Sequence, residues 1–145
     1  MYSTLHDGDK LFTSNLFYTP EQGDIIILRT PSYNEPLVKR VIAVEGQTVD
    51  IDFNTGVVYV DGEALDEPYT YEPTYLSNGF EGPVTVPEGM VFVMGDNRNN
   101  SNDSRHPAIG CIDNRAILGK VYMILIPGKD SDGTRNWSRF GLVKE

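Results

Sequence analysis

The hydrophobic residues of this chain fall into short runs separated by turn residues. Apolar runs of this kind, bounded by Gly, Pro, Asn and Asp, are typical of β-strands, whereas an amphipathic helix shows a longer 3.6-residue period. We expect strands over residues 11–12, 25–28, 37–44, 49–53, 57–60, 90–94, 109–112 and 117–127. The pattern predicts a mainly β fold class. We expect one antiparallel β-barrel-like domain over residues 1–145, closed or half-closed.

One segment, residues 63–88, breaks this pattern. It is irregular, aromatic and proline-bearing, and its acidic residues include Glu63, Asp66, Glu67, Glu72 and Glu81. We expect an insert in the β domain, either a loop or a small subdomain.

Composition excludes several classes of function. The 145 residues are 39% hydrophobic, enough for the core of a single domain. The formal net charge is −9 and no basic tract is present, which argues against nucleic acid as a partner. The single cysteine, Cys111, rules out an intramolecular disulfide and is expected to be a packed thiol. His6 and His106 belong to no metal-like cluster, so the sequence predicts no metal and no cofactor.

Gly95–Arg105 is the most distinctive polar stretch. Its eleven residues follow the apolar run 90–94 and include no apolar side chain, but hold two carboxylates, two guanidiniums, four amides and two hydroxyls. These groups can bond one another into a fixed loop, and polar loops on rigid strands often carry sites. A solvated turn is one alternative. A calcium loop is another, but its spacing fails, since Ser101 and Pro107 stand where Gly and Glu are needed.

The run 37–44 carries two cations, Lys39 and Arg40, within an apolar strand. Strict alternation would place Lys39 on one face with Leu37, Val41 and Ala43, and Arg40 on the other with Val38, Ile42 and Val44. Desolvation lowers the pKa of a lysine, and a neutral amine is a competent general base. The alternative is a lysine whose stem packs at the strand end while its amine reaches water.

Four blocks of this sequence resemble, in order, the motifs of the bacterial type I signal peptidases. These are membrane-bound Ser/Lys endopeptidases that remove signal peptides from secreted proteins. The last block is the most specific, since it resembles the family's Gly-Asp-Asn-Arg-x-x-Ser-x-Asp-Ser-Arg motif. The blocks are residues 1–9, 23–25, 39–42 and 95–105.

The resemblance implies a mechanism. In this family a serine attacks the carbonyl after Ala-x-Ala and forms an acyl-enzyme. By resemblance, Lys39 is the general base that accepts the serine proton and later activates a water. Ser101 hydrogen-bonds the Lys39 amine and orients it, as aspartate orients histidine in a catalytic triad.

Five further residues take supporting roles by the same resemblance. Asp103 and Arg105 are expected to form an ion pair that braces the loop, with Asp96 and Arg40 as further partners. Arg98 belongs to the same motif and is assigned structural support.

The implied partners are the signal peptides of secreted preproteins. The substrate is expected to lie as an extended strand beside Met1, Tyr2, Pro36, Leu37 and Val38. The family also implies a cell-membrane location, with the catalytic domain on the extracytoplasmic side. No stretch of this sequence has the length of a transmembrane helix and no signal peptide is apparent. We therefore expect the N-terminal anchor to be absent and these residues to be soluble.

Two departures from the family stand out. Ser3 occupies a position that is usually proline. The family's nucleophilic serine directly precedes the methionine that matches Met1, so the residues given lack a nucleophile, and we predict that they are inactive on their own. Ser3 cannot replace that serine, because a displacement of two residues would miss the reacting carbonyl by several ångströms.

Two other functions stay open. A self-cleaving repressor-type Ser/Lys peptidase would require an upstream DNA-binding region, and it does not share the Gly95–Arg98 block. The second alternative is a non-catalytic β domain that binds extended peptides, since a base without a nucleophile leaves only a binding groove.

Overall fold

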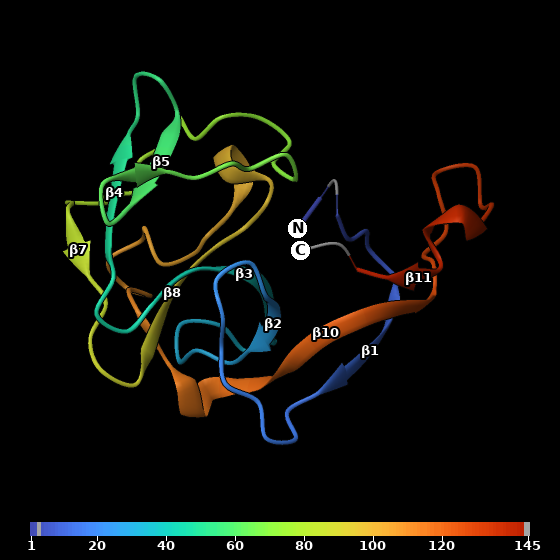
Figure 1. Ribbon diagram of the computed structural model, residues 1–145. Helices are drawn as coiled ribbons and strands as arrows, with labels where there is room; N and C mark the ends of the chain where they lie inside the picture. The colour runs from blue at the N-terminus through green and yellow to red at the C-terminus, as the bar shows by residue number, and fades with distance from the viewer. Residues whose placement is uncertain (3, 144–145) are drawn as a thin grey trace.

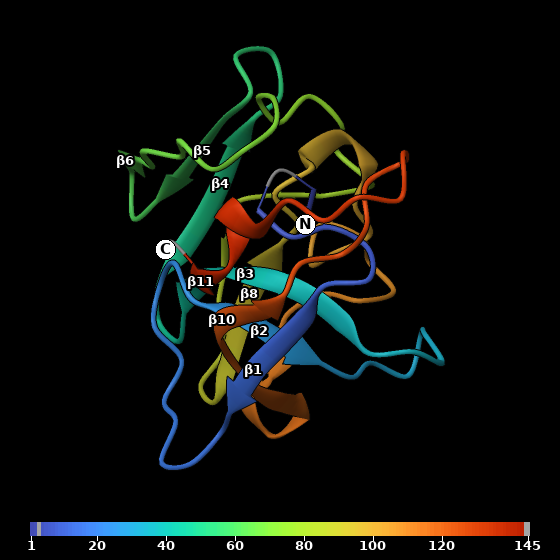
Figure 2. The same cartoon turned by 90° about the vertical axis from the view of Figure 1, so that its right-hand side faces the viewer.

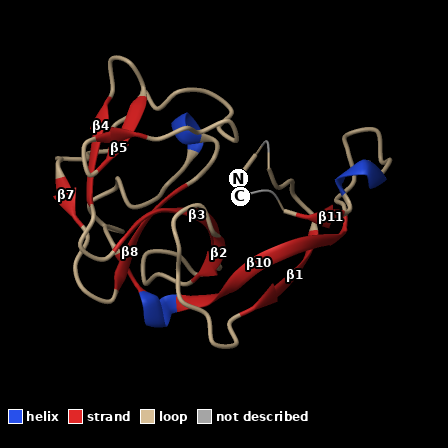
Figure 3. Ribbon diagram, viewed as in Figure 1, coloured by secondary structure: helices blue, strands red, loops and turns tan. Residues whose placement is uncertain are grey.

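The computed structural model describes residues 1–2 and 4–143, which form two antiparallel sheets (Figures 1 and 3). Ser3, one of the two departures noted above, lies outside the described residues. The larger sheet has seven strands in the order β1-β10-β2-β3-β8-β9, with β11 also paired to β10. Its strands are β1 (Lys10–Ser14), β2 (Ile25–Leu28), β3 (Leu37–Val44), β8 (Met90–Met94), β9 (Ile112–Asp113), β10 (Ile117–Ile126) and β11 (Gly141–Leu142).

The smaller sheet has four strands in the order β6-β5-β4-β7. They are β4 (Thr48–Asp52), β5 (Val57–Val60), β6 (Glu63–Ala64) and β7 (Val84–Thr85), so both ends of the insert 63–88 join this sheet. Three short 3-10 helices complete the described elements: η1 (Arg98–Asn100), η2 (Asn114–Ala116) and η3 (Trp137–Arg139).

The mainly β, antiparallel architecture predicted from the sequence is confirmed, but neither sheet closes into a barrel. The larger sheet ends at β9, which has two residues and, among the described strands, pairs only with β8. Of the strand predicted over residues 109–112, only Ile112 lies in a strand, the two-residue β9. The insert 63–88 is irregular between its two terminal strands.

Strict alternation along β3 holds only as far as Val41. The pairing with β8 shifts between Val41 and Ala43, which marks a β-bulge. Ile42 and Ala43 therefore both pack in the cluster beneath the smaller sheet, while Val41 and Val44 pack in a second cluster. The predicted faces of Ala43 and Val44 were wrong, because a bulge places one extra residue in the strand and inverts the order beyond it.

The C-terminal tail folds back over the N-terminal segment, and Figure 2 views the molecule from the side of β1, β10 and β11. The Asp9 carboxylate accepts a 2.7 Å hydrogen bond from the Gly128 amide and forms a 2.6 Å ion pair with Arg139. Strand β11 adds to the edge of β10. Within residues 1–2 and 4–143, the helices are too short and polar to cross a membrane.

Candidate active site

Lys39 lies in the middle of β3 and is 8% exposed. Its Nζ donates a 2.9 Å hydrogen bond to Oγ of Ser101, which comes from the polar loop after β8. Burial lowers the pKa of Lys39, and Arg105 lowers it further, against the opposite effects of Asp103 and Asp96. The structure thus joins the lysine and the serine, 62 positions apart, into one pair whose amine has a lowered pKa.

Gly95 allows this close approach. It follows β8 directly, and a Cβ built on it would lie 2.2 Å from Ser101 Oγ and 3.5 Å from Lys39 Nζ. Its amide donates a 3.0 Å hydrogen bond to the carboxylate of Asp103. A side chain at Gly95 would therefore push Ser101 away from the lysine.

Asp103 and Arg105 form a buried ion pair that closes the loop. The Arg105 Nε and Nη2 each lie 2.9 Å from an oxygen of Asp103, and both side chains are 0% exposed. Burial would raise the pKa of Asp103, but the hydrogen bonds and charge of Arg105 outweigh it, so this pKa is lowered. Arg105 also donates to the backbone oxygens of Arg98 (2.6 Å) and Leu76 (2.7 Å).

Arg40, the neighbour of Lys39, belongs to a different network. Its guanidinium makes two 2.9 Å hydrogen bonds to the Asp96 carboxylate, a third 2.9 Å bond to the Gly23 carbonyl, and lies 3.8 Å from the centre of the Tyr69 ring. Arg40 and Asp96 are both fully buried. Asp96 also accepts a hydrogen bond from the hydroxyl of Thr4, which ties the N-terminal turn to this pair.

The N-terminal turn places the Met1 nitrogen where the charge of Lys39 acts on it. The Met1 carbonyl accepts hydrogen bonds from the amides of Thr4 (3.1 Å) and Leu5 (2.9 Å). Burial lowers the pKa of the Met1 amino group and the Lys39 charge lowers it further, while Asp96 and Asp103 raise it.

The predicted substrate residues lie around one free strand edge. β2 pairs with β3 from Leu37 onward, but β8 pairs with it only from Arg40, so among the described strands nothing covers the opposite edge of residues 37–39. A cavity of about 1030 Å³ adjoins this edge and is lined in part by Met1, Tyr2 and Val38. Pro36 is exposed at the start of the strand and does not line that cavity.

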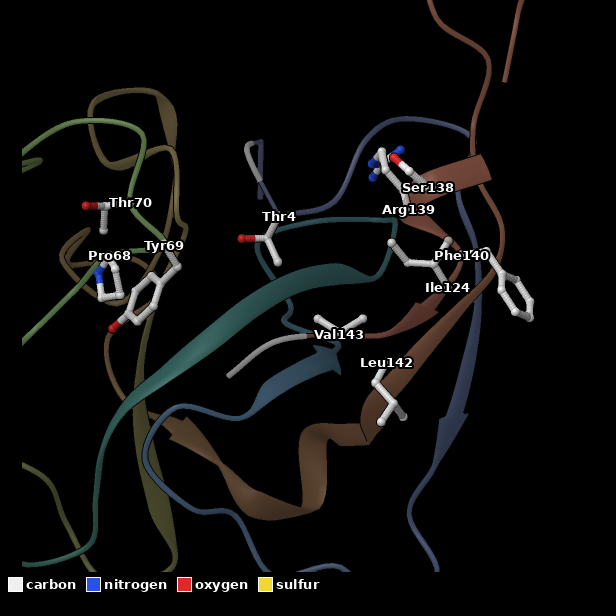
Figure 4. Close-up of a pocket in the computed structure, with 10 residues that line it drawn as sticks. All are labelled: Thr4, Pro68, Tyr69, Thr70, Ile124, Ser138, Arg139, Phe140, Leu142 and Val143. Carbon is white, nitrogen blue, oxygen red and sulfur yellow. The ribbon is translucent and has the colours of Figure 1, made fainter. Parts of the chain in front are cut away.

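A second cavity, of about 520 Å³, lies between the insert and the tail (Figure 4). Figure 4 shows Thr4 between the Pro68–Thr70 segment on one side and residues 138–143 on the other. Tyr69 forms one wall of the cavity and also covers Arg40, so the cavity adjoins the Arg40–Asp96 pair rather than Lys39.

Sequence reasoning missed the partners that the insert contributes. Arg98, which we assigned only general support, is fully buried and forms two hydrogen bonds to Glu67, at 2.8 and 2.6 Å. Asn78 donates a 2.9 Å bond to the Ser101 carbonyl. The sequence signalled only an acidic, irregular segment, and nothing in it marks which acid faces an arginine.

Comparison with known proteins adds the evolutionary context. The profile of the family described as "Signal peptidase, peptidase S26" matches residues 1–126. The chain is 39% identical to a signal peptidase I from Bacillus amyloliquefaciens over 93% of its own length and 74% of that protein. It is 37% identical to signal peptidase I T from Bacillus subtilis, over 93% and 74%. A crystal structure of a signal peptidase I from Enterococcus faecalis matches with a TM-score of 0.59 and 31% identity, covering 71% of this chain and 97% of that one.

Proposed function

The chain belongs to the signal peptidase family, peptidase S26, and we propose that Lys39 is its general base and Ser101 the residue that orients it. Proteolytic removal of signal peptides is the activity that its relatives' names carry, and this chain is an endopeptidase domain of that type. The observation that carries the assignment is the buried Lys39 Nζ held 2.9 Å from Ser101 Oγ, with no carboxylate bonded to it among the described residues.

The nucleophile of the proposed reaction is a serine joined to the Met1 nitrogen. The Lys39 charge acts on the Met1 amino group, which supports placing this serine hydroxyl where it can pass its proton to the neutral amine as it attacks the scissile carbonyl. The peptide C–N bond then breaks, the amine leaves with a proton from the lysine, and an acyl-serine remains. Water, activated by Lys39 in turn, hydrolyses that ester and restores the serine.

The proposed substrate is an extended signal peptide that pairs with the free edge of residues 37–39. Strand addition supplies backbone hydrogen bonds, and the adjoining cavity receives alternate side chains. Met1, Tyr2 and Val38 line that cavity. We propose that small residues before the cut, Ala-x-Ala, are preferred. A cell-membrane location with an extracytoplasmic catalytic domain belongs to the same proposal.

Cleavage of an Ala-x-Ala signal-peptide substrate in detergent tests this function. A polypeptide of residues 1–145 alone is expected to show no turnover, whereas the same polypeptide with a serine ahead of Met1 should cleave the substrate. Lys39→Ala should abolish that cleavage, while Lys10→Ala, an exposed lysine on β1, should leave it unchanged. If the folded serine-bearing chain binds the peptide without cutting it, the chain is a peptide-binding domain instead.

A further inference from the structure

The insert 63–88 contacts the active-site loop at several places. Asn78 donates a 2.9 Å hydrogen bond to the Ser101 carbonyl, and the Leu76 carbonyl accepts one from Arg105. The Asn99 side chain in turn accepts hydrogen bonds from the amides of residues 75 and 76, each at 2.9 Å, and donates one to the carbonyl of residue 73. The insert therefore lies against the loop rather than apart from it.

The charged contact between the two is the pair Glu67–Arg98. The Arg98 side chain is 0% exposed and that of Glu67 is 11% exposed. Two parallel hydrogen bonds join them, and Arg98 also donates a 3.1 Å bond to Oγ1 of Thr74, another buried residue of the insert. A buried guanidinium requires a carboxylate partner, and the bidentate geometry fixes its plane as well as its position.

Arg98 transmits this constraint to the catalytic pair. Its Nε donates a 3.0 Å hydrogen bond to the Gly95 carbonyl, and Gly95 packs directly against Ser101, which accepts the hydrogen bond from Lys39. Only Arg98 and Gly95 thus separate Glu67 from the hydroxyl that orients the lysine.

We propose that Glu67 is a positioning residue of this peptidase, which holds Arg98 and through it keeps Gly95 and Ser101 in place against Lys39. Glu67 hydrogen-bonds Arg98 and Tyr69 and makes no bond to Lys39. The proposal rests on the proposed function, because it assigns Glu67 a role in the same Ser101–Lys39 arrangement. The insert is then part of the active-site support.

Kinetics of the serine-bearing chain provide the first test. Glu67→Ala is expected to lower kcat by about 10- to 100-fold, since a displacement of the reacting groups by about 1 Å is enough for such a loss. KM should change little, because the peptide cleft beside Val38 is not lined by the insert. Glu67→Gln keeps the shape and one acceptor and should retain intermediate activity. Asp66→Asn, the same loss of charge at an exposed neighbour, is the control.

Titration of Lys39 in residues 1–145 provides the second test, by NMR of ¹³Cε-labelled lysine with Lys39→Ala for assignment. The charged groups that act on Lys39 are Asp103, Arg105, Asp96 and the Met1 amine. A loosened loop admits water to the amine, so Glu67→Ala should raise the pKa of Lys39 towards its ordinary value. Direct loss of a negative charge would lower this pKa instead, so the sign separates positioning from simple electrostatics.

The outcomes test the role of Glu67 and the proposed peptidase function separately. Unchanged kcat and an unchanged Lys39 titration in folded Glu67→Ala, or in Glu67→Gln where the alanine variant does not fold, would overturn the role of Glu67. A lowered pKa, or an equal effect of Asp66→Asn, would overturn it as well. If the serine-bearing wild-type chain fails to cleave, the proposed function fails, whereas the titration still reports on Glu67.

Discussion

Lys39 and Arg40 are consecutive residues of one strand, yet they belong to two regions of opposite character. Both are buried, at 8% and 0% exposure. Arg40 is bonded to the carboxylate of Asp96 and covered by Tyr69, whereas the one side-chain partner of Lys39 among residues 1–2 and 4–143 is the hydroxyl of Ser101. One region neutralises its cation, and the other leaves the cation without a bonded carboxylate.

The contrast shows what separates a structural cation from a catalytic one. The carboxylate that acts most strongly on Lys39 is Asp103, which is already bonded to Arg105. Lys39 is therefore desolvated without full compensation, and its pKa is lowered by burial. Burial alone does not make a general base, because a buried cation can have its charge compensated by a bonded carboxylate, as Asp96 does for Arg40, and because a guanidinium does not lose its proton in proteins.

The largest expected effect on stability comes from removing the carboxylate that compensates the buried charge of Arg40. Asp96→Asn should reduce the free energy of unfolding by about 3–5 kcal/mol, because it leaves a buried guanidinium without a carboxylate. Urea denaturation measures this. Arg115→Ala, which breaks the exposed Asp113–Arg115 pair, is the matched control and should cause no measurable change. A small effect of Asp96→Asn would mean that Arg40 does not depend on its carboxylate.

A smaller effect is expected from the other region. Ser101→Ala in the serine-bearing chain should lower kcat by about 10- to 100-fold, because Lys39 loses the acceptor that orients it. Stopped assays on the signal-peptide substrate give the rate. Ser104→Ala, which removes a hydroxyl bonded to the Val93 amide in the same loop, should cost about 1 kcal/mol of stability and change kcat less. Equal losses of kcat in the Ser101 and Ser104 variants would show that catalysis depends on the integrity of the loop rather than on the hydrogen bond between Ser101 and Lys39.

The smallest effect concerns the pH dependence of stability. The pKa of Lys39 is lowered from its ordinary value of 10.5 in the folded state, so between the two values the unfolded chain binds more protons. The contribution of Lys39 to the free energy of unfolding therefore rises with pH across this window. Lys39→Met should stabilise the protein most below the window, with the gain shrinking towards pH 10.5. Denaturant titrations at several pH values test this, and a pH-independent gain would contradict a lowered pKa.

Local patterns in the sequence predicted most of the strands and the composition of the site. Apolar runs between turn residues identified β2, β3, β5, β8 and β10, because the spacing of apolar residues and the turn residues that flank them are local properties of the sequence. The Lys39–Arg40 pair and the polar loop were equally visible, because a lysine within an apolar strand and eleven residues without an apolar side chain are both rare. The roles of these residues remain predictions until cleavage is measured.

The tertiary structure decided the contacts that neither the local patterns nor the family resemblance indicated. The bulge after Val41 depends on the pairing with β8, the open edges of the sheet depend on how far β9 extends, and Glu67 finds Arg98 across 31 positions. The acids of the insert look alike in sequence, since their differences arise only when the chain packs. The sequence by itself placed a lysine within an apolar strand, and the family resemblance implied Ser101 as its partner. The packing determined that this lysine would be buried, with its amine 2.9 Å from the Ser101 hydroxyl, because burial depends on what the rest of the chain lays over the strand.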